Sequence, residues 1–357
     1  MKPEIIQMNE HLSQTQHQID LILNRYQSIL EALSEVHLGP TSQIYLIGNG
    51  SSGEGARIAS YFVLELFNRN PMCINPYQFV HYNHQGIQAG DLVIALSQTG
   101  TSHLVVESIR LANQAKAITV ALSATKNCPL LNEAQYPLLF EECAEKVDYK
   151  VTGVIGLLYG LWITLLGVAA ANELVNKKQI DETIHTFHTI NNQYDELVKL
   201  AKDWTDKNVE RLEDSFTLTV LGSGALAEVA MEVAVKSAEV QNRFSASVDT
   251  EEFLHGYCAA NPKNNVIIML VDEASFSFSK KVYEAIQERN QAVIWIGYQA
   301  PGDDLRFDCG VSGSFNTAYF IPVVHALLIQ WAALKKYGDK GTEIFAFYQE
   351  RLKVREQ

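Results

Sequence analysis

The sequence repeats one strand-and-turn pattern at an almost constant distance of 174 residues. Gly48-Asn-Gly50 follows the apolar run 43–47, and Gly222-Ser-Gly224 follows the apolar run 216–221. The next runs match in the same register: 92–96 with 266–270, and 117–121 with 292–296. Short apolar runs between glycine and hydroxyl residues are typical of central parallel strands covered on both faces. The shared register therefore predicts an α/β fold of two tandem doubly wound parallel-sheet domains, formed by duplication and joined by helices.

Two turns of the first copy combine glycine with hydroxyl side chains. One turn follows the strand at 43–47, and the other follows the strand at 92–96. A turn at the carboxyl end of a parallel strand presents backbone N–H groups and the positive end of the next helix to an anion. Neither turn contains lysine, which excludes the phosphate loop of nucleotide-binding proteins. We therefore predict a site for a phosphorylated small molecule, formed by Gly50, Ser51, Ser52, Ser97, Gln98, Thr99, Thr101 and Ser102.

The second copy does not keep these hydroxyl groups. The residues that match Ser97–Ser102 are Val271-Asp-Glu-Ala-Ser-Phe276, which bring in two carboxylates. Carboxylates repel phosphate at close range. We expect the phosphate site in the first domain only.

Composition limits the class of protein. The chain has 357 residues, of which 47% are hydrophobic, so two domains with buried cores fit its length. Its formal net charge of −13 argues against nucleic acid and anionic membranes as partners. The five cysteines show no metal-binding spacing, and the N-terminal segment shows no signal-peptide pattern. We expect a cytoplasmic protein with reduced cysteines, no metal and no cofactor.

Residues 154–171 carry no charge and are long enough to cross a membrane. A helix that is apolar on all sides is also typical of a large protein core or a subunit interface. No cluster of positive residues flanks the segment, which favours a buried helix. The segment 319–334 is similarly apolar. Apolar residues at helical spacing predict further helices within 1–37 and 172–214.

The two turns resemble the phosphosugar-binding turns of the sugar isomerase (SIS) family, whose domains have a flavodoxin-like fold. The duplicated arrangement is similar to the isomerase half of glucosamine-6-phosphate synthase, and to the fructosamine-6-phosphate deglycases and deaminases of the same group. The resemblance extends from about residue 35 to the C-terminus. It implies an N-terminal helix at 1–34, a phosphosugar-binding SIS domain at 35–175, a helical connection at 176–205, a second, catalytic SIS domain at 206–338 and a tail at 339–357.

A second match lies in the second copy, where Lys236-Ser-Ala-Glu239 is followed by Glu252-Phe-Leu-His255. The resemblance implies that Lys236 and Glu252 surround the sugar and that Glu239 moves a proton between C1 and C2. It also implies that His255 opens the sugar ring from the partner subunit of a homodimer. Lys353 in the tail resembles a lysine that handles the open-chain sugar.

The residue types allow this chemistry, although each is also compatible with a purely structural role. Sugar rearrangement needs a base beside a carbonyl or imine carbon, and an apolar site raises a carboxyl pKa toward neutrality for that role. A partner such as Lys236 opposes that rise in the pKa of Glu239. Taken singly, Lys236 with Glu239 is typical of a solvated helix pair, and His255 of a hydrogen-bonded structural histidine.

The sequence departs from the family pattern in two places. Gly256 is followed by Tyr257, where the family often has proline, and no glutaminase half with an N-terminal cysteine is present. Glutamine-fed amination of fructose 6-phosphate is therefore not expected. Isomerisation, deamination and cleavage of a sugar–amine adduct remain open, on an amino-sugar or fructosamine 6-phosphate. A regulatory protein that senses sugar phosphate without chemistry is the alternative.

Overall fold

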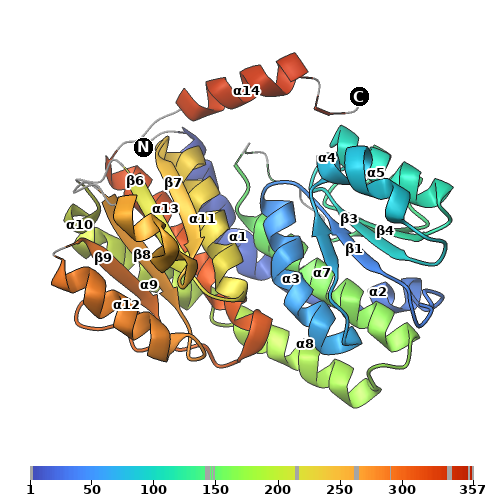
Figure 1. The fold of residues 1–357 in the computed structure, drawn as a ribbon, viewed down its shortest axis with the longest axis horizontal. Coiled ribbons are helices and arrows are strands. Elements are labelled where there is room, and N and C mark those ends of the chain that lie inside the picture. Colours follow the sequence, from blue (N-terminus) through green and yellow to red (C-terminus); the bar gives the residue numbers. More distant parts are fainter. Residues whose placement is uncertain are drawn as a thin grey trace. The chain divides into compact units, whose positions relative to one another are not determined.

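The computed structural model describes residues 3–140, 145, 147, 149–213, 217–260, 265–289, 291–335, 340–352 and 354–355 (Figure 1). The chain divides into two compact units. The first-repeat unit comprises residues 14–191 and 345–357, and the second-repeat unit comprises residues 1–13 and 192–344. Each unit contains one parallel sheet of five strands in its described part.

The sheet of the first-repeat unit has the strand order β2-β1-β3-β4-β5, with every described pairing parallel. Because β1 and β3 are neighbours, with Ile47 paired to Ala95, the turns that follow them leave the same edge of the sheet. The strands are β1 Ile44–Ile47, β2 Met72–Ile74, β3 Leu92–Leu96, β4 Ile118–Ser123 and β5 Tyr136–Leu139. The helices that lie wholly in this unit are α2 Tyr26–Ala32, α3 Ser51–Phe67, α4 Pro76–Gln78, α5 His103–Gln114, α6 Pro129–Glu133, α7 Thr152–Ala171 and α8 Lys177–Asn191, with short turns Phe79–Asn83 and His84–Gly86.

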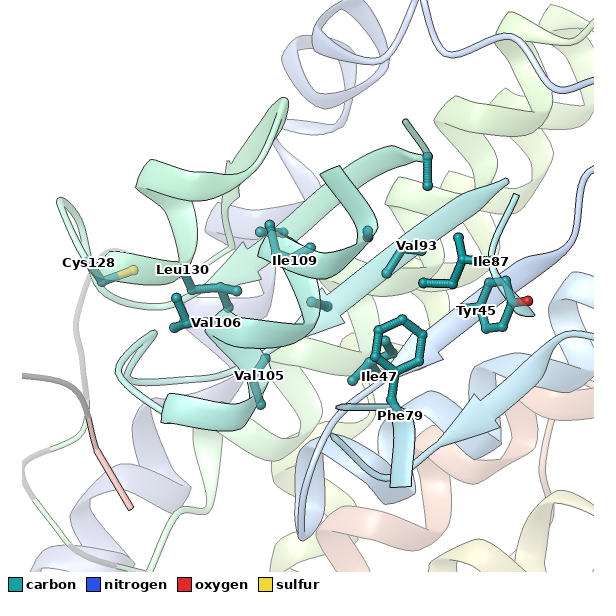
Figure 2. Packing of buried hydrophobic residues seen from close by; sticks show 14 residues of the cluster. Tyr45, Ile47, Phe79, Ile87, Val93, Val105, Val106, Ile109, Cys128 and Leu130 are labelled. Carbon is teal, nitrogen blue, oxygen red and sulfur yellow. The ribbon is translucent and has the colours of Figure 1, made fainter. Parts of the chain in front are cut away.

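Alternate residues of these strands supply cores on opposite faces of the sheet. On one face Ile47 and Val93 pack with Val106 and Ile109 of α5, and Phe79 closes the cluster (Figure 2). The other face is covered by α3 and α7, which pack against each other and against the strands. Apolar burial on both faces explains why these strands read as short continuous apolar runs.

The sheet of the second-repeat unit has the order β10-β9-β8-β6-β7, again with parallel pairings. Read from β7, this is the strand order of the first sheet. The strands are β6 Thr217–Gly222, β7 Phe244–Asp249, β8 Asn265–Val271, β9 Val293–Gly297 and β10 Leu305–Arg306. The helices are α9 Tyr194–Asn208, α10 Glu210–Glu213, α11 Ala225–Gln241, α12 Phe276–Glu288 and α13 Thr317–Lys335, with short turns Glu252–His255, Tyr257–Ala260 and Gly313–Asn316. The unit division falls within α1 Pro3–Leu23 and α14 Lys340–Leu352.

The predicted fold class is confirmed. The paired strands of the two copies occupy matching positions in sheets of the same order. The helices expected within 1–37 and 172–214 are also present.

The two apolar segments are buried helices. Both α7 and the stretch that contains α13 are long and apolar enough to cross a membrane by length and composition. However, 89% of the α7 window and 83% of the other window are buried within the protein. The prediction of a buried helix at 154–171 is therefore confirmed.

Candidate functional site

The first glycine turn places two serines at the start of α3. Gly50 has φ +51° and ψ −136°, and it precedes Ser51, the first residue of the helix. Gly48 lies so close to the helix that an added Cβ would be 2.8 Å from the backbone of Ser52. Both serines are only partly buried. Their hydroxyl groups and the first backbone N–H groups of α3 therefore lie at the positive end of a helix dipole.

The second turn, residues 97–102, is held by its own hydroxyl groups. Ser97 is buried, and its Oγ accepts from the backbone N of Gly100 at 3.1 Å and donates to Ser102 Oγ at 3.3 Å. Thr99 Oγ1 and Thr101 Oγ1 are 3.0 Å apart. Gly100 has φ +65°, and a Cβ there would be 2.0 Å from Cys128 Sγ. The sequence of the turn thus fixes a loop with hydroxyl groups at the start of α5.

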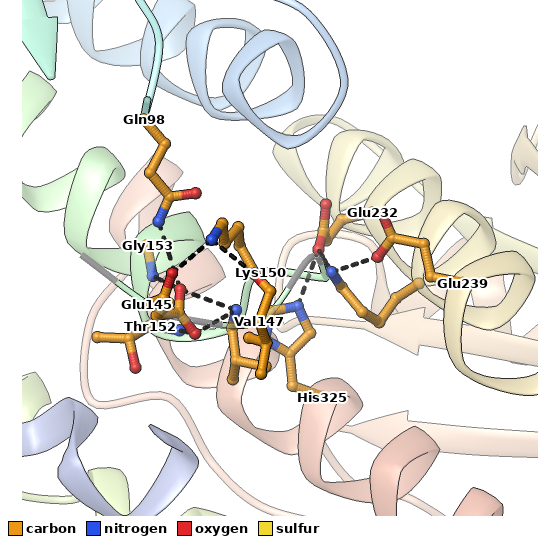
Figure 3. A network of polar contacts seen from close by, with 11 residues as sticks. Gln98, Glu145, Val147, Lys150, Thr152, Gly153, Glu232, Glu239 and His325 are labelled. Carbon is orange, nitrogen blue, oxygen red and sulfur yellow. Dashed lines mark hydrogen bonds and ion pairs between the residues drawn. The ribbon is translucent and has the colours of Figure 1, made fainter. Parts of the chain in front are cut away.

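Gln98 connects this turn to the start of α7 (Figure 3). Its Nε2 donates to Glu145 Oε2 at 3.3 Å, and its side chain leaves no room for a Cβ at Gly153. The buried Glu145 carboxylate accepts from the backbone N atoms of Val151, Thr152 and Gly153 at 2.7–3.2 Å. A carboxylate at this position satisfies the free N–H groups of the helix and complements its dipole.

The end of the chain lies against the second turn. The backbone N of His103 donates to Val354 O at 3.1 Å, and Ser102 forms an isolated antiparallel bridge with Arg355. Lys353, predicted from the resemblance to handle the open-chain sugar, lies outside the described residues. Its role stays a prediction.

A buried charged network lies in the second-repeat unit, where α11 faces α13 (Figure 3). Lys236 Nζ is 2.6 Å from Glu239 Oε2 and 3.7 Å from Glu232 Oε1. His325 Nε2 is 2.9 Å from Glu232 Oε1. The side chains of Glu232, Lys236 and His325 are only 1% exposed, whereas that of Glu239 is 23% exposed. Glu239 is therefore the one carboxylate of this network that solvent or a ligand reaches.

The surroundings of Glu239 act on its pKa in opposite directions. Burial is the largest effect and raises the pKa above the ordinary carboxyl value. The Lys236 ammonium lowers it, the Glu232 carboxylate raises it and His325 lowers it, and the net change is upward. The Lys236 pairing expected from the sequence is present, and burial outweighs it.

His255 lies on an exposed turn after β7. Its side chain is 61% exposed and its Nε2 lies 2.6 Å from Glu251 Oε1. The Glu251 carboxylate raises the histidine pKa by hydrogen bonding and by its charge. Glu252 is also exposed. Within the described residues, no hydrogen bond or ion pair joins His255 to Glu239.

Sequence reasoning missed Glu232, His325 and Glu145. A signal existed for Glu232, which lies four residues before Lys236 and seven before Glu239, on the same face of one helix. His325 and Glu145 are distant in sequence from the residues they contact, so spacing could not reveal them. The described residues include no group of three or more His, Cys, Asp or Glu placed to hold a metal ion.

Comparison with known proteins supports a family assignment for the first repeat. The SIS domain model matches residues 37–156. The first repeat is a SIS domain. The chain is also 20% identical over 321 residues to glutamine–fructose-6-phosphate aminotransferase (isomerizing) of Leifsonia xyli, covering 88% of this chain and 52% of that protein. The corresponding protein of Mycolicibacterium smegmatis is 23% identical over 251 residues, covering 68% of this chain and 38% of its own length. The chain thus spans about half the length of these relatives or less.

Solved structures share the fold along nearly the whole chain. A Clostridium difficile protein described as a candidate phosphosugar isomerase has a TM-score of 0.86 at 18% identity, covering 97% of both chains. The C-terminal domain of glucosamine-fructose-6-phosphate aminotransferase from Francisella tularensis has a TM-score of 0.78 at 16% identity, covering 93% of this chain and 97% of that one. Glucosamine-6-phosphate deaminase from Thermotoga maritima has a TM-score of 0.71 at 17% identity, covering 92% and 95%. These matches show a shared fold of two tandem α/β units, and the SIS domain model matches the first of them.

Proposed function

We propose that this protein is an enzyme that rearranges or cleaves a 6-phosphorylated amino sugar or fructosamine by proton transfer between C1 and C2. The observation that carries the proposal is the partly exposed Glu239 carboxylate, which ends an otherwise buried charged network and has a raised pKa. The resemblance to phosphosugar isomerases and deaminases supports the substrate class.

The first repeat supplies the proposed phosphate site. The hydroxyl groups of Ser51 and Ser52 offer donors at one strand end, at the positive end of the α3 dipole. The turn 97–102 offers further hydroxyl groups at the neighbouring strand end. Uncharged donors at a helix N-terminus are sufficient for a phosphate group without a lysine.

The second repeat supplies the proposed chemistry. The ionised Glu239 removes a proton from the carbon next to the C=O or C=N group of the open-chain sugar. The electron pair of the broken C–H bond forms the double bond of an enediol or enamine, and the carbonyl or imine heteroatom takes up a proton. Return of the proton from Glu239 to the neighbouring carbon, with loss of a proton from the hydroxyl or amine group on the first carbon, forms the new C=O or C=N bond and completes the rearrangement. Hydrolysis of the resulting imine by water then releases an amine.

The network behind Glu239 is suited to hold this base in place. Lys236 is buried and contacts Glu239 and Glu232, and Glu232 contacts His325. Breaking a buried ion pair by removing one partner costs about 3–5 kcal/mol, so the arrangement keeps the Glu239 carboxylate oriented without a metal. Burial keeps its pKa above that of an ordinary carboxyl group, which strengthens it as a base near neutral pH.

We also propose a homodimer in which His255 and Glu252 act in the partner's site. Both helices α7 and α13 are covered within the single chain, so their apolar length gives no argument for a dimer. Two other features support one. His255 is exposed, and no hydrogen bond or ion pair among the described residues joins it to Glu239. Helix α14 carries the exposed apolar residues Ile344, Phe347, Tyr348 and Leu352. Sedimentation of a monomer at micromolar concentration would contradict the dimer.

Incubation with sugar phosphates in deuterated water tests the function. Glucosamine 6-phosphate, fructose 6-phosphate and a set of fructosamine 6-phosphates serve as substrates, with ammonia, amino acid and hexose phosphate as readouts. We expect deuterium at C1 or C2 of one substrate class, because the abstracted proton exchanges with solvent. Tight phosphosugar binding with no exchange and no product would instead favour the regulatory sugar-phosphate sensor.

A further inference from the structure

The second-repeat unit contains a pocket of about 440 Å³ outside the carboxyl ends of β8 and β9. Its walls come from residues 272–274 after β8, Tyr298 after β9, the segment 309–313 and Asn316 just before α13. This volume lies in the range of small-molecule sites. Ligands of parallel α/β sheets bind at this edge, which is also the edge that carries the hydroxyl turns in the first repeat.

The pocket wall is negatively charged. Asp272 and Glu273 line it, Asp308 directly precedes the lining residue Cys309, and no lysine or arginine is among the lining residues. Burial, the larger cause, and the charges of Asp272 and Asp308 together raise the pKa of the Cys309 thiol to about 12. Such a pocket disfavours phosphate and attracts a cation.

One lining residue, Asn316, is a buried amide. Asn316 is 4% exposed, and its Nδ2 donates to Asp272 Oδ2 at 2.6 Å. Its Oδ1 has no hydrogen-bond partner among the described residues. Leaving a buried acceptor unsatisfied is costly, so this oxygen favours a ligand that donates a hydrogen bond.

The Asp272 carboxylate is held in place from its own turn. Its Oδ1 accepts from Ser275 N at 2.9 Å and from Ser275 Oγ at 2.6 Å. With Asn316 on Oδ2, the carboxylate is fixed before a ligand arrives, and this preorganisation lowers the entropic cost of binding.

We propose that this pocket binds a small hydroxylated amine, with its ammonium group against Asp272, Glu273 and the Asn316 carbonyl oxygen. Tyr298 gives the lining an aromatic residue, a type that attracts cations, and the exposed Ser312 offers a hydrogen-bond partner for a hydroxyl group. An organic ammonium ion fits better than a metal ion, because the described residues hold no cluster of three or more metal-ligating side chains. This site is separate from the proposed proton-transfer site at Glu239.

Calorimetric titration of the full chain tests the proposal with a matched pair of probes. Glucosamine carries the ammonium group, whereas N-acetylglucosamine has the same ring with a neutral amide, and neither carries phosphate. We expect glucosamine to bind about tenfold more tightly, because charge-assisted hydrogen bonds to carboxylates are roughly twice as strong as neutral ones. Equal binding of the two probes would overturn the proposal.

Two variants locate the binding. Glu273→Gln and Asp272→Asn should each weaken glucosamine binding about fivefold, the loss expected for one partly solvated charge contact. Glu288→Gln, an exposed carboxylate on α12 that does not line the pocket, should leave binding unchanged. Unfolding midpoints confirm that each variant is folded.

The same variants distinguish this proposal from the proposed enzymatic function. Phosphosugar turnover should persist in Glu273→Gln, while glucosamine binding weakens. Loss of both together would overturn a separate site. A chain without turnover on any sugar phosphate could still bind glucosamine through Glu273, and that result would support this site while refuting the enzyme.

Discussion

Helices α3 and α11 open the two repeats and show how duplicated elements have diverged. Each has 17 residues and follows a glycine with positive φ, +51° at Gly50 and +58° at Gly224. Gly48 directly follows β1 and Gly222 ends β6, and at both glycines a Cβ would clash with the backbone of the helix. The backbone of the turn is therefore kept in both copies, and only side chains differ.

Those side chains divide the proposed tasks. The first residues of α3 are Ser51 and Ser52, whereas α11 begins with Ala225 and Leu226. Further along the helix, α11 has the polar residues and α3 the apolar ones. The positions of α11 that hold Glu232 and Lys236 correspond in α3 to the buried apolar residues Ile58 and Phe62. The first copy thus keeps donors for an anion at its turn, and the second copy has buried charges at the positions of Glu232 and Lys236.

The largest expected effect is on turnover, and it is tested by one substitution in α11 and the matching substitution in α3. Glu239→Gln keeps the shape of the side chain but removes the base, so turnover should fall about 10²–10⁴-fold while phosphosugar binding remains. The control is Glu65→Gln, the matching position 174 residues earlier on α3, which should retain turnover. Steady-state kinetics and calorimetry measure both.

The outcome decides whether chemistry belongs to the second copy. Full activity in Glu239→Gln would end the proton-shuttle proposal and favour the sensor. If both glutamate variants lost activity alike, the division of tasks between the helices would be wrong.

The next effect concerns the two turns after β3 and β8. Ser97→Ala removes the hydroxyl that binds Gly100 N and Ser102 Oγ, so phosphosugar binding should weaken by about 1–3 kcal/mol. Ser275→Ala, in the matching turn of the second copy, should leave that affinity unchanged. Calorimetry with fructose 6-phosphate measures the affinity of both variants. Equal losses of affinity would contradict a phosphate site specific to the first turn.

A smaller effect concerns stability in the same turns, because Gly100 corresponds to Ala274 in the second copy. Gly100→Ala places a Cβ 2.0 Å from Cys128 Sγ at φ +65°, so the free energy of unfolding should fall by about 1–3 kcal/mol. Gly86→Ala has open space and should change it little. Denaturant unfolding measures both variants. An unchanged midpoint for Gly100→Ala would show that the first turn accepts an alanine at this position, as the second turn does.

The duplication made much of this fold predictable from the sequence. Strand register and the Gly-x-Gly turns are local patterns, so the sheets, the buried apolar helices and the turn positions followed from spacing. The pairing of Lys236 with Glu239 followed from helix geometry for the same reason.

The rest depended on contacts between distant segments. His325 reaches Glu232 from α13, and Glu145 reaches the start of α7 and Gln98, through side-chain packing that has no local sequence signature. The raised pKa of Glu239 could not be predicted from the sequence either, because it depends on how far the effect of burial exceeds that of the paired lysine. The helix spacing predicted the pairing of Lys236 with Glu239 but not how deeply the pair is buried.

The last prediction uses Glu232, which the first copy replaces with Ile58, to test how the second copy tunes its base. Glu239 acts only when ionised, so kcat/KM should fall as pH drops through a pKa above the ordinary carboxyl value of 4.5. The Glu232 charge raises that pKa, so Glu232→Gln should move the acid limb to lower pH. Titration of the substrate phosphate is common to both proteins and cancels in the comparison. A limb that stays in place, in a variant whose unfolding midpoint shows it folded, would mean that Glu239 is not the group that titrates.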